Sequence, residues 1–398
     1  MKVAHVTTID MSLRFLLLHQ LLTIQEAGYE VTGVSAPGAE VAFVEAAGIR
    51  HIAVPLTRAM SPLRDLASLL SLYRVFRREK FDVVHTHTPK GGLLGQYAAL
   101  FAGVPVRVHT IHGLYLPAHA TGWKRQAFLA LEKIAMRFSH YNLSQNPEDV
   151  ALAIREHLVD ADKLELLGNG IDVSHFDPER FSPEARRAKR RELGLEDHHL
   201  VVGMVARLVR EKGYLEMLEA AQIIRAQCPE ARFIFVGGVE PDKPDALAPS
   251  ILAEKGLSDV AQFLGHRTDL AELYATMDVS ALPSYREGFP RVPMEAAAMG
   301  LATVVTDVRG CRETVTHGMT GYLVPRADAP ALADALLLLL QDPELRGRFG
   351  VAARATALAE FDERVIFRRV LKTYERLCRT RLGRTTALES AIRADEST

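Results

Sequence analysis

The segment Glu287-Gly288-Phe289-Pro290-Arg291-Val292-Pro293-Met294-Glu295 places two carboxylates eight positions apart, with a glycine and two prolines between them. The apolar run Val279 to Leu282 precedes this segment, and small residues follow it at 296–300. That order predicts a strand, a glycine turn and the first turn of a closely packed helix. Amides at a helix start suit anionic or hydroxyl-bearing ligands, and carboxylates accept hydrogen bonds from sugar hydroxyls. The segment therefore indicates a nucleotide-sugar site.

Length and composition predict a globular chain of two domains. The 398 residues exceed one ordinary core, and 48% of them are hydrophobic against 24% charged. Lysine and arginine total 48 and the acidic residues 49, which argues against nucleic-acid binding. The three cysteines are far apart, as in a reduced cytosolic protein. Without a signal-peptide pattern or a spanning apolar run, we expect a cytoplasmic chain that can still touch the inner face of the membrane.

Strand-like and helix-like segments alternate along both halves of the chain. The strand-like runs of the first half are 2–7, 30–34, 83–87, 106–111 and 140–144. Those of the second half are 200–205, 232–236, 261–264, 279–282, 303–306 and 321–324. Strands that alternate with helices indicate βαβ units and parallel sheets. We therefore expect an α/β protein of two Rossmann-like, doubly wound domains, with ligands in a cleft at the carboxyl ends of the strands.

The breaks in this alternation predict the domain boundaries. We expect an acceptor-side domain at 1–175, a polar linker at 176–199 and a nucleotide-sugar-binding domain at 200–362. Residues 363–380 read as a C-terminal helix that can return to the first domain. The polar residues 381–398 read as a disordered tail.

Two cations follow the first strand of the second half. Arg207 and Lys212 lie in the loop before Gly213 and the next expected helix. Arginine can grip a phosphate with two hydrogen bonds, and lysine supplies a mobile point charge. Beside a helix N-terminus, the two would hold a diphosphate and stabilise it as a leaving group. The alternative is a solvated basic loop, because Arg210 and Glu211 also have surface character.

As a set, these motifs resemble the retaining GT-B glycosyltransferases of family 4, also called glycosyltransferase group 1. The resemblance covers nearly the whole second half, through Gly203…Arg207…Lys212-Gly213, Phe263-Leu264-Gly265, Pro283-Ser284…Glu287-Gly288-Phe289…Glu295 and Gly321-Tyr322-Leu323-Val324-Pro325. The first half carries individually weaker motifs, His85-Thr86-His87, Gly103-Val104-Pro105, His109-Thr110-Ile111-His112-Gly113 and Asn169-Gly170-Ile171-Asp172.

The resemblance implies a role for each residue of a donor site. Glu295 would bind the ribose hydroxyls, and Glu287 would approach the donor sugar near its reacting carbon. The backbone that would support the sugar and the diphosphate belongs to Gly288, Phe289, Pro290 and Arg291. The nucleobase would meet the loop at His266 and Arg267, unless that loop is only an exposed polar turn. Asp269 is expected to cap the next helix rather than to bind the base.

His112 is the first-half residue for which we expect a part in the chemistry. It follows the strand-like run 106–111, so its imidazole could hydrogen-bond the donor sugar or guide the acceptor hydroxyl. The resemblance supports the sugar contact, and a satisfied structural histidine is the alternative. With His85, His87 and His109 it also raises a metal site, but the spacing includes no carboxylate or thiolate. Asp160 and Asp162 read as a surface loop, so we expect neither a metal nor a cofactor.

The loop after the first strand departs from the family pattern, because the glycine pair that many members carry there is absent. Asp10, Ser12 and Arg14 could make the polar contacts to the acceptor instead. Alternatively, Ser12 simply caps the following helix, a position at which serine is favoured.

Basic residues interleave with apolar ones in two stretches of the first half. The basic residues are Arg58, Arg64, Arg74, Arg77, Arg78, Lys80, Lys124 and Arg125, and the second stretch holds the single tryptophan, Trp123. Such stretches suit an anionic membrane surface, although an ordinary amphipathic helix with a solvated face gives the same pattern. Family relatives with this type of first half often act on lipid-linked acceptors.

We therefore expect an enzyme that moves a sugar from a nucleoside-diphosphate sugar, with a UDP-sugar favoured, to an acceptor hydroxyl with retention. The acceptor would be lipid-linked, or another glycan of cell-surface polysaccharide synthesis. Two alternatives are a nucleotide-sugar epimerase of the same fold and a non-catalytic regulator that binds sugar nucleotides. The intact set Glu287, Glu295, Arg207 and Lys212 argues against the regulator.

Overall fold

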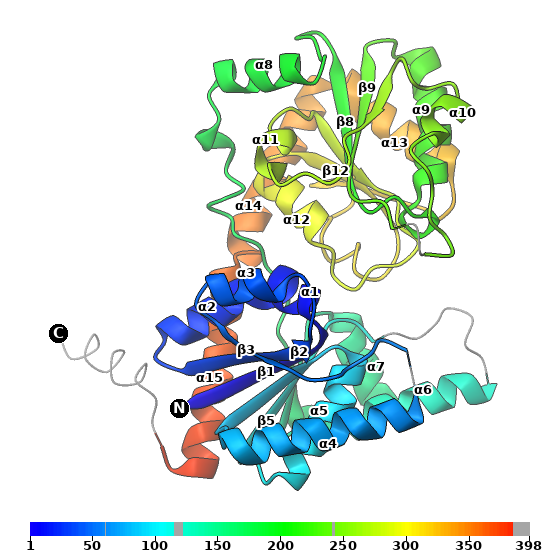
Figure 1. The fold of residues 1–398 in the computed structure, drawn as a ribbon. Coiled ribbons are helices and arrows are strands. Elements are labelled where there is room, and N and C mark those ends of the chain that lie inside the picture. Colours follow the sequence, from blue (N-terminus) through cyan, green and yellow to red (C-terminus); the bar gives the residue numbers. More distant parts are fainter. Residues whose placement is uncertain (60, 115–121, 241–242, 385–398) are drawn as a thin grey trace, which may run out of the picture. The chain divides into compact units, whose positions relative to one another are not determined.

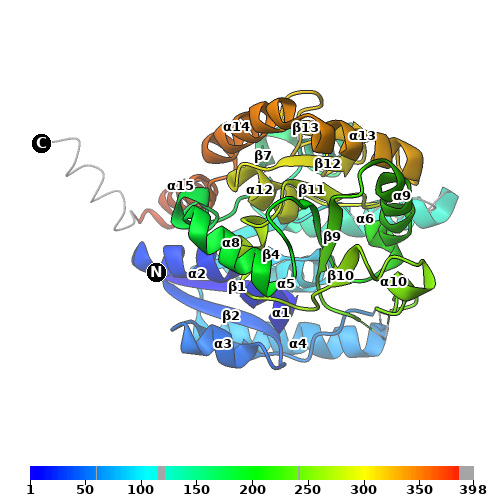
Figure 2. The same ribbon diagram turned by 90° about the horizontal axis from the view of Figure 1, so that it is seen from above.

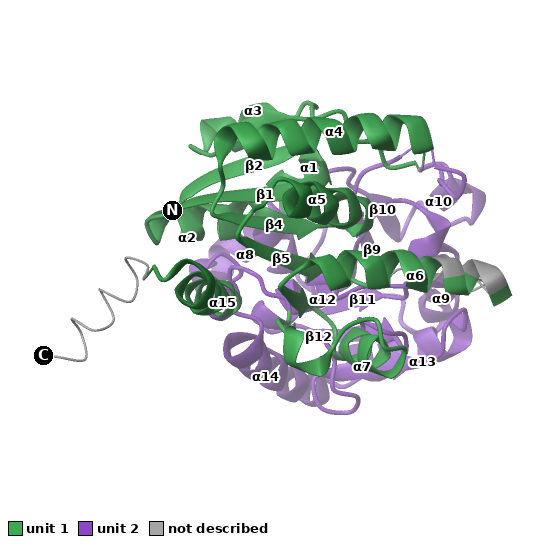
Figure 3. Ribbon diagram, turned by 90° about the horizontal axis from the view of Figure 1, so that it is seen from below, with its two compact units in different colours: residues 1–168, 366–398 green, residues 169–365 purple. Residues whose placement is uncertain are grey.

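The computed structural model describes residues 1–59, 61–114, 122–240 and 243–384, and leaves the side chains at 123, 124 and 127 undescribed. The chain divides into two compact units (Figure 3). Unit 1 comprises Met1–Gly168 and the chain from Ile366 onward, and unit 2 comprises Asn169–Val365.

Unit 1 is built on a seven-stranded parallel sheet in the order β3-β2-β1-β4-β5-β6-β7. Its strands are β1 (Lys2–Ile9), β2 (Glu30–Ala36), β3 (Arg50–Ala53), β4 (Val83–His87), β5 (Val106–Ile111), β6 (Tyr141–Ser144) and β7 (Leu164–Leu166). Its helices and helical turns are α1 (Asp10–Ser12), η1 (Leu13–Leu17), α2 (Leu18–Glu26), α3 (Val41–Ala46), α4 (Pro62–Glu79), α5 (Pro89–Phe101), α6 (Gly122–Phe138), α7 (Pro147–Arg155), η2 (Ala161–Lys163) and α15 (Glu363–Leu382).

Both faces of the unit 1 sheet are covered, which explains why its central strands are buried along almost their whole length. Val3 points to the face packed by α2 and α15, whereas Ala4 points to the face packed by α4 and α5. Helix α15, red in Figure 1, contributes a buried stripe through Val370, Tyr374 and Cys378. The C-terminal helix is therefore part of the unit 1 core.

Unit 2 is built on a six-stranded parallel sheet in the order β10-β9-β8-β11-β12-β13. Its strands are β8 (Leu200–Val205), β9 (Ala231–Val236), β10 (Ala261–Phe263), β11 (Val279–Leu282), β12 (Ala302–Thr306) and β13 (Gly321–Val324). Its helices and helical turns are η3 (Pro178–Arg180), α8 (Pro183–Glu192), η4 (Arg210–Lys212), α9 (Tyr214–Gln227), α10 (Ile251–Glu254), α11 (Leu270–Tyr274), α12 (Arg291–Ala298), α13 (Ala329–Gln341) and α14 (Pro343–Glu360).

Alternate residues of the unit 2 strands feed two separate cores. Val202 packs with α9 and α13, which lie side by side on one face (Figure 2), whereas Val201 packs with α11, α12 and α14 on the other. This period of two is what a sheet covered on both sides requires.

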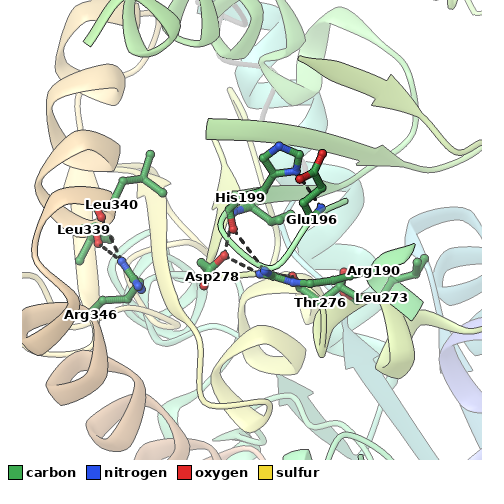
Figure 4. Close-up of polar contacts among 10 residues, drawn as sticks. Arg190, Glu196, His199, Leu273, Thr276, Asp278, Leu339, Leu340 and Arg346 are labelled. Carbon is green, nitrogen blue, oxygen red and sulfur yellow. Dashed lines mark hydrogen bonds and ion pairs between the residues drawn. The ribbon is translucent and has the colours of Figure 1, made fainter. Parts of the chain in front are cut away.

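The polar segment expected as a linker at 176–199 belongs to unit 2, so that expectation was wrong. Figure 4 shows Arg190 of α8 donating to the carbonyls of Thr276 (2.9 Å) and His199 (3.2 Å) and to the carboxylate of Asp278 (2.7 Å). These bonds connect α8 to the residues that precede β8 and β11. The boundary between the units falls after Gly168 rather than at 175. The polar composition of the segment suggested a linker, but the long-range hydrogen bonds of Arg190 hold the segment against unit 2.

Smaller differences occur at the ends of elements. The expectations omitted the short edge strands β3 and β7. The helix expected from Ser12 begins at Asp10 and passes through a π-helical turn at Leu13–Leu17. Helix α15 continues to Leu382, and positions 385–398 of the expected tail lie outside the described residues. No helix among the described residues has the length and apolarity needed to cross a bilayer.

Candidate active site

Two loops at the carboxyl ends of β8 and β11 come into direct contact in unit 2. Gly213, at the start of α9, has a φ of +78°, and a Cβ atom there would lie 2.0 Å from the carbonyl oxygen of Pro283. Only glycine permits both the left-handed backbone and this close approach. The contact brings the loop that carries Lys212 against the loop that carries Glu287.

Lys212 and Glu287 form an ion pair, with Nζ 2.6 Å from Oε1. The two side chains are 15% and 11% exposed. The structure thus joins two residues that are 75 positions apart in the sequence and that were predicted for one site. In the absence of a ligand each neutralises the other, and an anion that binds Lys212 would release a hydrogen-bond acceptor at Glu287.

Arg207 is held by a partner that the sequence did not reveal. Its guanidinium donates to Glu240 at 2.6 Å, and Lys243 approaches the same carboxylate at 3.6 Å. Arg207 is 40% exposed and Glu240 33% exposed, so solvent screens the pair. The Arg207–Glu240 ion pair therefore contributes little free energy, and a phosphate that replaced Glu240 would lose little of it. Glu240 carries no motif of its own, and only its place after β9 brings it to this loop.

Glu295 lies in the first turns of α12 and is 7% exposed. The hydroxyl of Tyr274 donates to its carboxylate at 3.1 Å, and Arg291 approaches it at 3.7 Å. Burial raises the pKa of Glu295, while Arg291 and the Tyr274 hydrogen bond oppose that rise. Tyr274 was missed from the sequence, since a buried tyrosine on a short helix looks like an ordinary core residue.

Asn169 and Gly310, which lie outside the glycine turn between the two glutamates, contact its backbone. Asn169 donates to the carbonyl of Phe289 at 2.9 Å. Gly310, with a φ of +88°, packs so closely that a Cβ atom would lie 2.7 Å from the carbonyl oxygen of Gly288. These two contacts fix the position of the segment Gly288–Arg291, and a fixed backbone lowers the entropic cost of binding a ligand.

Ion pairs hold the loop that was expected to contact the nucleobase. Arg267 donates to both carboxylate oxygens of Asp269, at 2.8 and 2.5 Å, and Lys189 contacts Asp269 at 2.7 Å. These partners hold the pKa of the Asp269 carboxyl well below its usual range, the Arg267 hydrogen bond being the largest cause. Asp269 occupies the N-cap position of α11, as expected, but its side chain makes no capping bond and pairs with Arg267 and Lys189 instead. His266, next to Arg267 in the sequence, is exposed.

In unit 1, His112 lies at the end of a chain of hydrogen-bonded imidazoles. His112 Nε2 is 3.0 Å from His87 Nδ1, and His87 Nε2 is 3.0 Å from His5 Nδ1. The phenol of Tyr374 contacts His5 Nε2 at 3.2 Å and His85 Nδ1 at 2.6 Å. Of these residues, only His85, His87 and His112 came from motifs in the sequence. His5 and Tyr374 were missed, because they reach the chain from β1 and α15.

Proton order along this chain is coupled from ring to ring. A neutral imidazole donates from one nitrogen and accepts at the other, so the choice made at His5 sets His87 and then His112. Burial lowers the pKa of His5 to about 3 and that of His112 to about 4, and it lowers the pKa of His87 well below its ordinary value. The rings are therefore neutral at pH 7.

The same imidazoles bear on the metal alternative. Ligand nitrogens of His5, His85 and His87 lie within 4.8 Å of one another. The His5 and His87 planes differ by only 14°, with centroids 5.2 Å apart, and one hydrogen bond joins a nitrogen of each ring. Nitrogen lone pairs lie in the ring plane, so lone pairs aimed at a neighbouring ring do not converge on one ion. The geometry favours the hydrogen-bonded chain. His109 bonds instead to Thr86 at 2.9 Å.

The loop after β1 is organised by its own contacts. Asp10 accepts from the amide of Glu40 at 2.8 Å, and Arg14 pairs with Glu40 while its guanidinium carbon lies 3.6 Å from the centroid of the Phe43 ring. Ser12 makes no side-chain capping bond, so the capping alternative was wrong. It lines a pocket of unit 1 instead. Of the surface loop at 160–162, Asp160 pairs with Lys163 at 2.6 Å.

Comparison with known proteins identifies both halves of the chain. Residues 185–356 match the family described as Glycosyl transferases group 1, and residues 17–170 match the Glycosyl transferase 4-like domain. The chain is 32% identical over 302 residues to UDP-Gal:alpha-D-GlcNAc-diphosphoundecaprenol alpha-1,3-galactosyltransferase of Escherichia coli, covering 75% of this chain and 76% of that protein. It is 29% identical to the capsular polysaccharide biosynthesis glycosyltransferase CapM of Staphylococcus aureus, covering 94% and 96%.

Solved structures share the fold. Alr3699/HepE of Anabaena, crystallised in complex with UDP-glucose, superposes with a TM-score of 0.78 at 23% identity, covering 94% of this chain and 99% of that one. A glycosyltransferase from Rickettsia africae superposes with a TM-score of 0.79 at 20% identity, covering 94% and 98%. The two Rossmann-like units are thus those of GT-B proteins, as the sequence predicted.

Proposed function

Because this chain belongs to the glycosyl transferases group 1 family, and is therefore a glycosyltransferase, we propose that it transfers a sugar from a UDP-sugar to an acceptor hydroxyl with retention. The observation that carries the proposal is the contact between Lys212 and Glu287 beside α12. One residue of this pair suits the leaving diphosphate and the other suits the sugar. UDP is favoured because the E. coli relative is named for a UDP-sugar donor.

In this proposal, each residue binds a different part of the donor. Arg207 exchanges Glu240 for the diphosphate, and Lys212 turns from Glu287 to the same group. Glu287 then accepts hydrogen bonds from the sugar hydroxyls, and Glu295 accepts those of the ribose. The backbone of Gly288, Phe289, Pro290 and Arg291 supports the diphosphate and the sugar, and the loop at His266 and Arg267 borders the base.

The chemical step is a displacement on one face of the sugar. The bond from the anomeric carbon to the diphosphate oxygen breaks, and the bond to the acceptor oxygen forms on the same face. The acceptor proton passes to the departing phosphate, whose charge Arg207 and Lys212 stabilise. To His112 we assign the sugar hydrogen bond that the family resemblance implies. No step needs a metal or a cofactor.

The acceptor is proposed to be lipid-linked, in cell-surface polysaccharide synthesis. The E. coli relative and a Campylobacter jejuni relative at 29% identity are both named for diphospho-undecaprenol acceptors. Helix α4 supports this reading, because Leu63, Leu66, Leu70 and Tyr73 are 85%, 54%, 45% and 36% exposed in a stripe at helical spacing. Exposed arginines at 64, 74, 77 and 78 flank the stripe.

Not all of the basic stretches serve this surface equally. Arg125 is paired with Glu156 at 2.7 Å, and the side chains of Trp123 and Lys124 lie outside the described ones. The proposed membrane surface therefore rests on α4. It would place the protein at the inner face of the cell membrane without a spanning helix.

A thermal-shift panel tests the donor. UDP-, GDP- and ADP-sugars are added to the wild-type protein and to Lys212→Ala, since a ligand that binds the folded state raises its melting temperature. We expect a shift with UDP-sugars that Lys212→Ala diminishes. Incubation of the donor alone separates transfer from epimerisation: an isomerised sugar without acceptor would favour the epimerase, whereas acceptor-dependent release of UDP supports the transferase.

A further inference from the structure

The hydrogen-bonded imidazoles of unit 1 continue beyond His5 to a threonine. The phenol of Tyr374 lies between His5 Nε2, at 3.2 Å, and His85 Nδ1, at 2.6 Å. The second ring nitrogen of His85, Nε2, is 2.7 Å from the hydroxyl oxygen of Thr110. Both nitrogens of His85 are therefore paired, and the chain of hydrogen bonds runs from Thr110 on β5 to His112, which follows the same strand.

With every bond made and every ring neutral, this chain can hold its protons in only two orders. A neutral imidazole has one N–H and one bare nitrogen, and a phenol has one O–H, so each member donates to one neighbour and accepts from the other. In the forward order Thr110 donates to His85, every bond points toward His112, and His112 Nε2 accepts from His87. In the reverse order His85 donates to Thr110, and His112 Nε2 donates to His87. Reversal of one bond thus requires reversal of all of them.

Burial makes the loss of a single bond in this chain costly. The side chains of His5, His85, His87 and Tyr374 are buried. A donor or acceptor that lost its partner there would have no water to replace it. The rings of His85 and His87 are also stacked, with centroids 4.3 Å apart, which restrains both ring planes. The hydrogen bonds of the chain are therefore expected to change direction together.

The two ends of the chain differ in how they tolerate each order. At one end, the side chain of Gln145 hydrogen-bonds His112, and an amide can either donate or accept. At the other end, Thr110 is 2% exposed, and His85 is the one hydrogen-bond partner of its hydroxyl among the described residues. In the forward order the hydroxyl donates its proton to His85, whereas in the reverse order that proton has no acceptor. Because an unpaired buried donor is costly, Thr110 favours the forward order.

We propose that the Thr110 hydroxyl fixes the tautomer of His112, so that this imidazole carries its proton on Nδ1 and serves a substrate only as a hydrogen-bond donor. Thr110 is thus a positioning residue, which acts through the side chains between it and His112. The proposal rests on the proposed function, in which His112 hydrogen-bonds the donor sugar. A sugar oxygen that accepts would meet the N–H of this ring, whereas a sugar hydroxyl that must donate would find no bare nitrogen on it.

Long-range proton–nitrogen NMR of the full-length protein, with isotope-labelled histidine, shows which ring nitrogen carries the proton. The signals of His112 are assigned by their loss in His112→Gln. In the wild type at pH 7 we expect the Nδ1–H form of His112 to exceed the Nε2–H form roughly tenfold or more. Thr110→Val keeps the shape of the side chain but removes the hydroxyl, so both orders leave Nε2 of His85 without a partner. The two forms of His112 should then be similar in population.

Three further variants separate the effect of the hydroxyl from effects on the fold. Thr110→Ser keeps the hydroxyl and should retain the wild-type tautomer of His112. Thr32→Val alters another buried threonine of the same sheet, whose hydroxyl makes no hydrogen bond within the described part of the chain, and it should also leave the tautomer unchanged. Tyr374→Phe breaks the chain in its middle, so it should make the two forms of His112 similar in population. This second break keeps the test decisive if Thr110→Val does not fold.

Turnover with a UDP-sugar provides a second measurement. If transfer uses only the forward order, kcat/KM scales with the population of that order, so equal populations lower kcat/KM about twofold. Thr110→Val and Tyr374→Phe should both show this loss without a change in the Kd of UDP, and Thr110→Ser should not show it. A merely structural role of Thr110 would not couple the loss in kcat/KM to the tautomer of His112.

The outcomes distinguish this proposal from the proposed function. An Nε2–H tautomer of His112 in the wild type would overturn the proposal, and so would an Nδ1–H tautomer that Thr110→Val leaves unchanged. Wild-type kcat/KM in a variant whose tautomer has changed would overturn the part that Thr110 plays in the reaction. A tautomer that depends on Thr110, with His112 signals that no UDP-sugar shifts, would retain the control by Thr110 and refute the sugar contact of the proposed function.

Discussion

The two units solve the problem of placing polar groups at a sheet edge in opposite ways. In unit 2 the candidate donor residues are ion-paired, Lys212 with Glu287 and Arg207 with Glu240. In unit 1 the imidazoles of His5, His87 and His112 are neutral and bonded to one another. Charged pairs can exchange partners with a charged ligand, whereas a neutral chain keeps its geometry. Under the proposed function, unit 2 would respond to a diphosphate, whereas unit 1 keeps a fixed chain of hydrogen bonds in its interior.

The largest expected effect comes from removing a cation of unit 2. Lys212→Ala and Arg207→Ala should each lower kcat/KM, by an amount that corresponds to about 2–4 kcal/mol of lost transition-state stabilisation. In the proposed reaction, each of the two wild-type side chains stabilises the charge of the leaving diphosphate. Steady-state kinetics with a UDP-sugar measure the loss. Lys243→Ala is the matched control, since Lys243 contacts the same Glu240 without an assigned role. Turnover like that of the wild type in both variants would disprove the exchange of partners.

The two glutamates should separate binding from turnover. Glu295→Gln should weaken UDP binding by about 1.5–3 kcal/mol, because it loses charged hydrogen bonds to the ribose, which changes little during reaction. Glu287→Gln should chiefly lower kcat. Calorimetry of UDP binding and single-turnover rates distinguish the two. Tyr274→Phe, which removes the donor to Glu295, should follow Glu295→Gln with a smaller loss. The reverse pattern would mean that the roles of the two glutamates are exchanged.

Neutral buried imidazoles should make unit 1 sensitive to acid. Burial lowers the pKa of His109 to about 4, so between pH 6.5 and 4 the unfolded chain binds a proton that the folded chain does not. Stability is thus complete above pH 6.5 and falls on acidification, by about 1.4 kcal/mol per pH unit for each such histidine.

His109→Gln tests this slope without breaking the imidazole chain. Urea unfolding at pH 6.5 and 5.5 should show roughly 1 kcal/mol less acid destabilisation in the variant than in the wild type. Far-UV circular dichroism follows the transition. The same pH dependence in both proteins would show that His109 is not kept neutral by burial.

Membrane association should be a smaller effect that salt weakens. Each cation of α4 near an anionic surface contributes roughly 1 kcal/mol within a Debye length, and inserted leucines leave a salt-resistant part. Sedimentation with anionic vesicles at low and high salt separates the two. The triple change Leu63→Ser, Leu66→Ser and Leu70→Ser should remove the resistant part, whereas Leu358→Ser, at an exposed leucine of unit 2, should not. Protein that stays in the supernatant at low salt would favour a soluble acceptor.

Chelation should have no effect on activity. In the proposed reaction, Arg207, Lys212 and the start of α12 would provide the positive charge that a divalent ion supplies in other enzymes. Turnover with and without EDTA measures this. Activity that is lost in EDTA and restored by manganese or magnesium would refute it.

The sequence by itself determined what depends on local spacing. Alternating strand-like and helix-like runs predicted the strands of both sheets except the short edge strands β3 and β7. The motif around Glu287 and Glu295 predicted the strand, glycine turn and helix that carry them. The sequence also shows glycine at 213 and 310. At both positions the left-handed backbone and the close approach of another segment require this residue type.

Only the tertiary structure decided which distant residues meet. The polar composition of 176–199 suggested a linker, but the hydrogen bonds of Arg190 hold α8 in unit 2. Glu240, Tyr274, His5 and Tyr374 follow no local pattern, and each meets its partners only when strands and helices pack. Pairing and burial are properties of the packed fold: a carboxylate or an imidazole acquires its partner and its pKa from residues tens to hundreds of positions away.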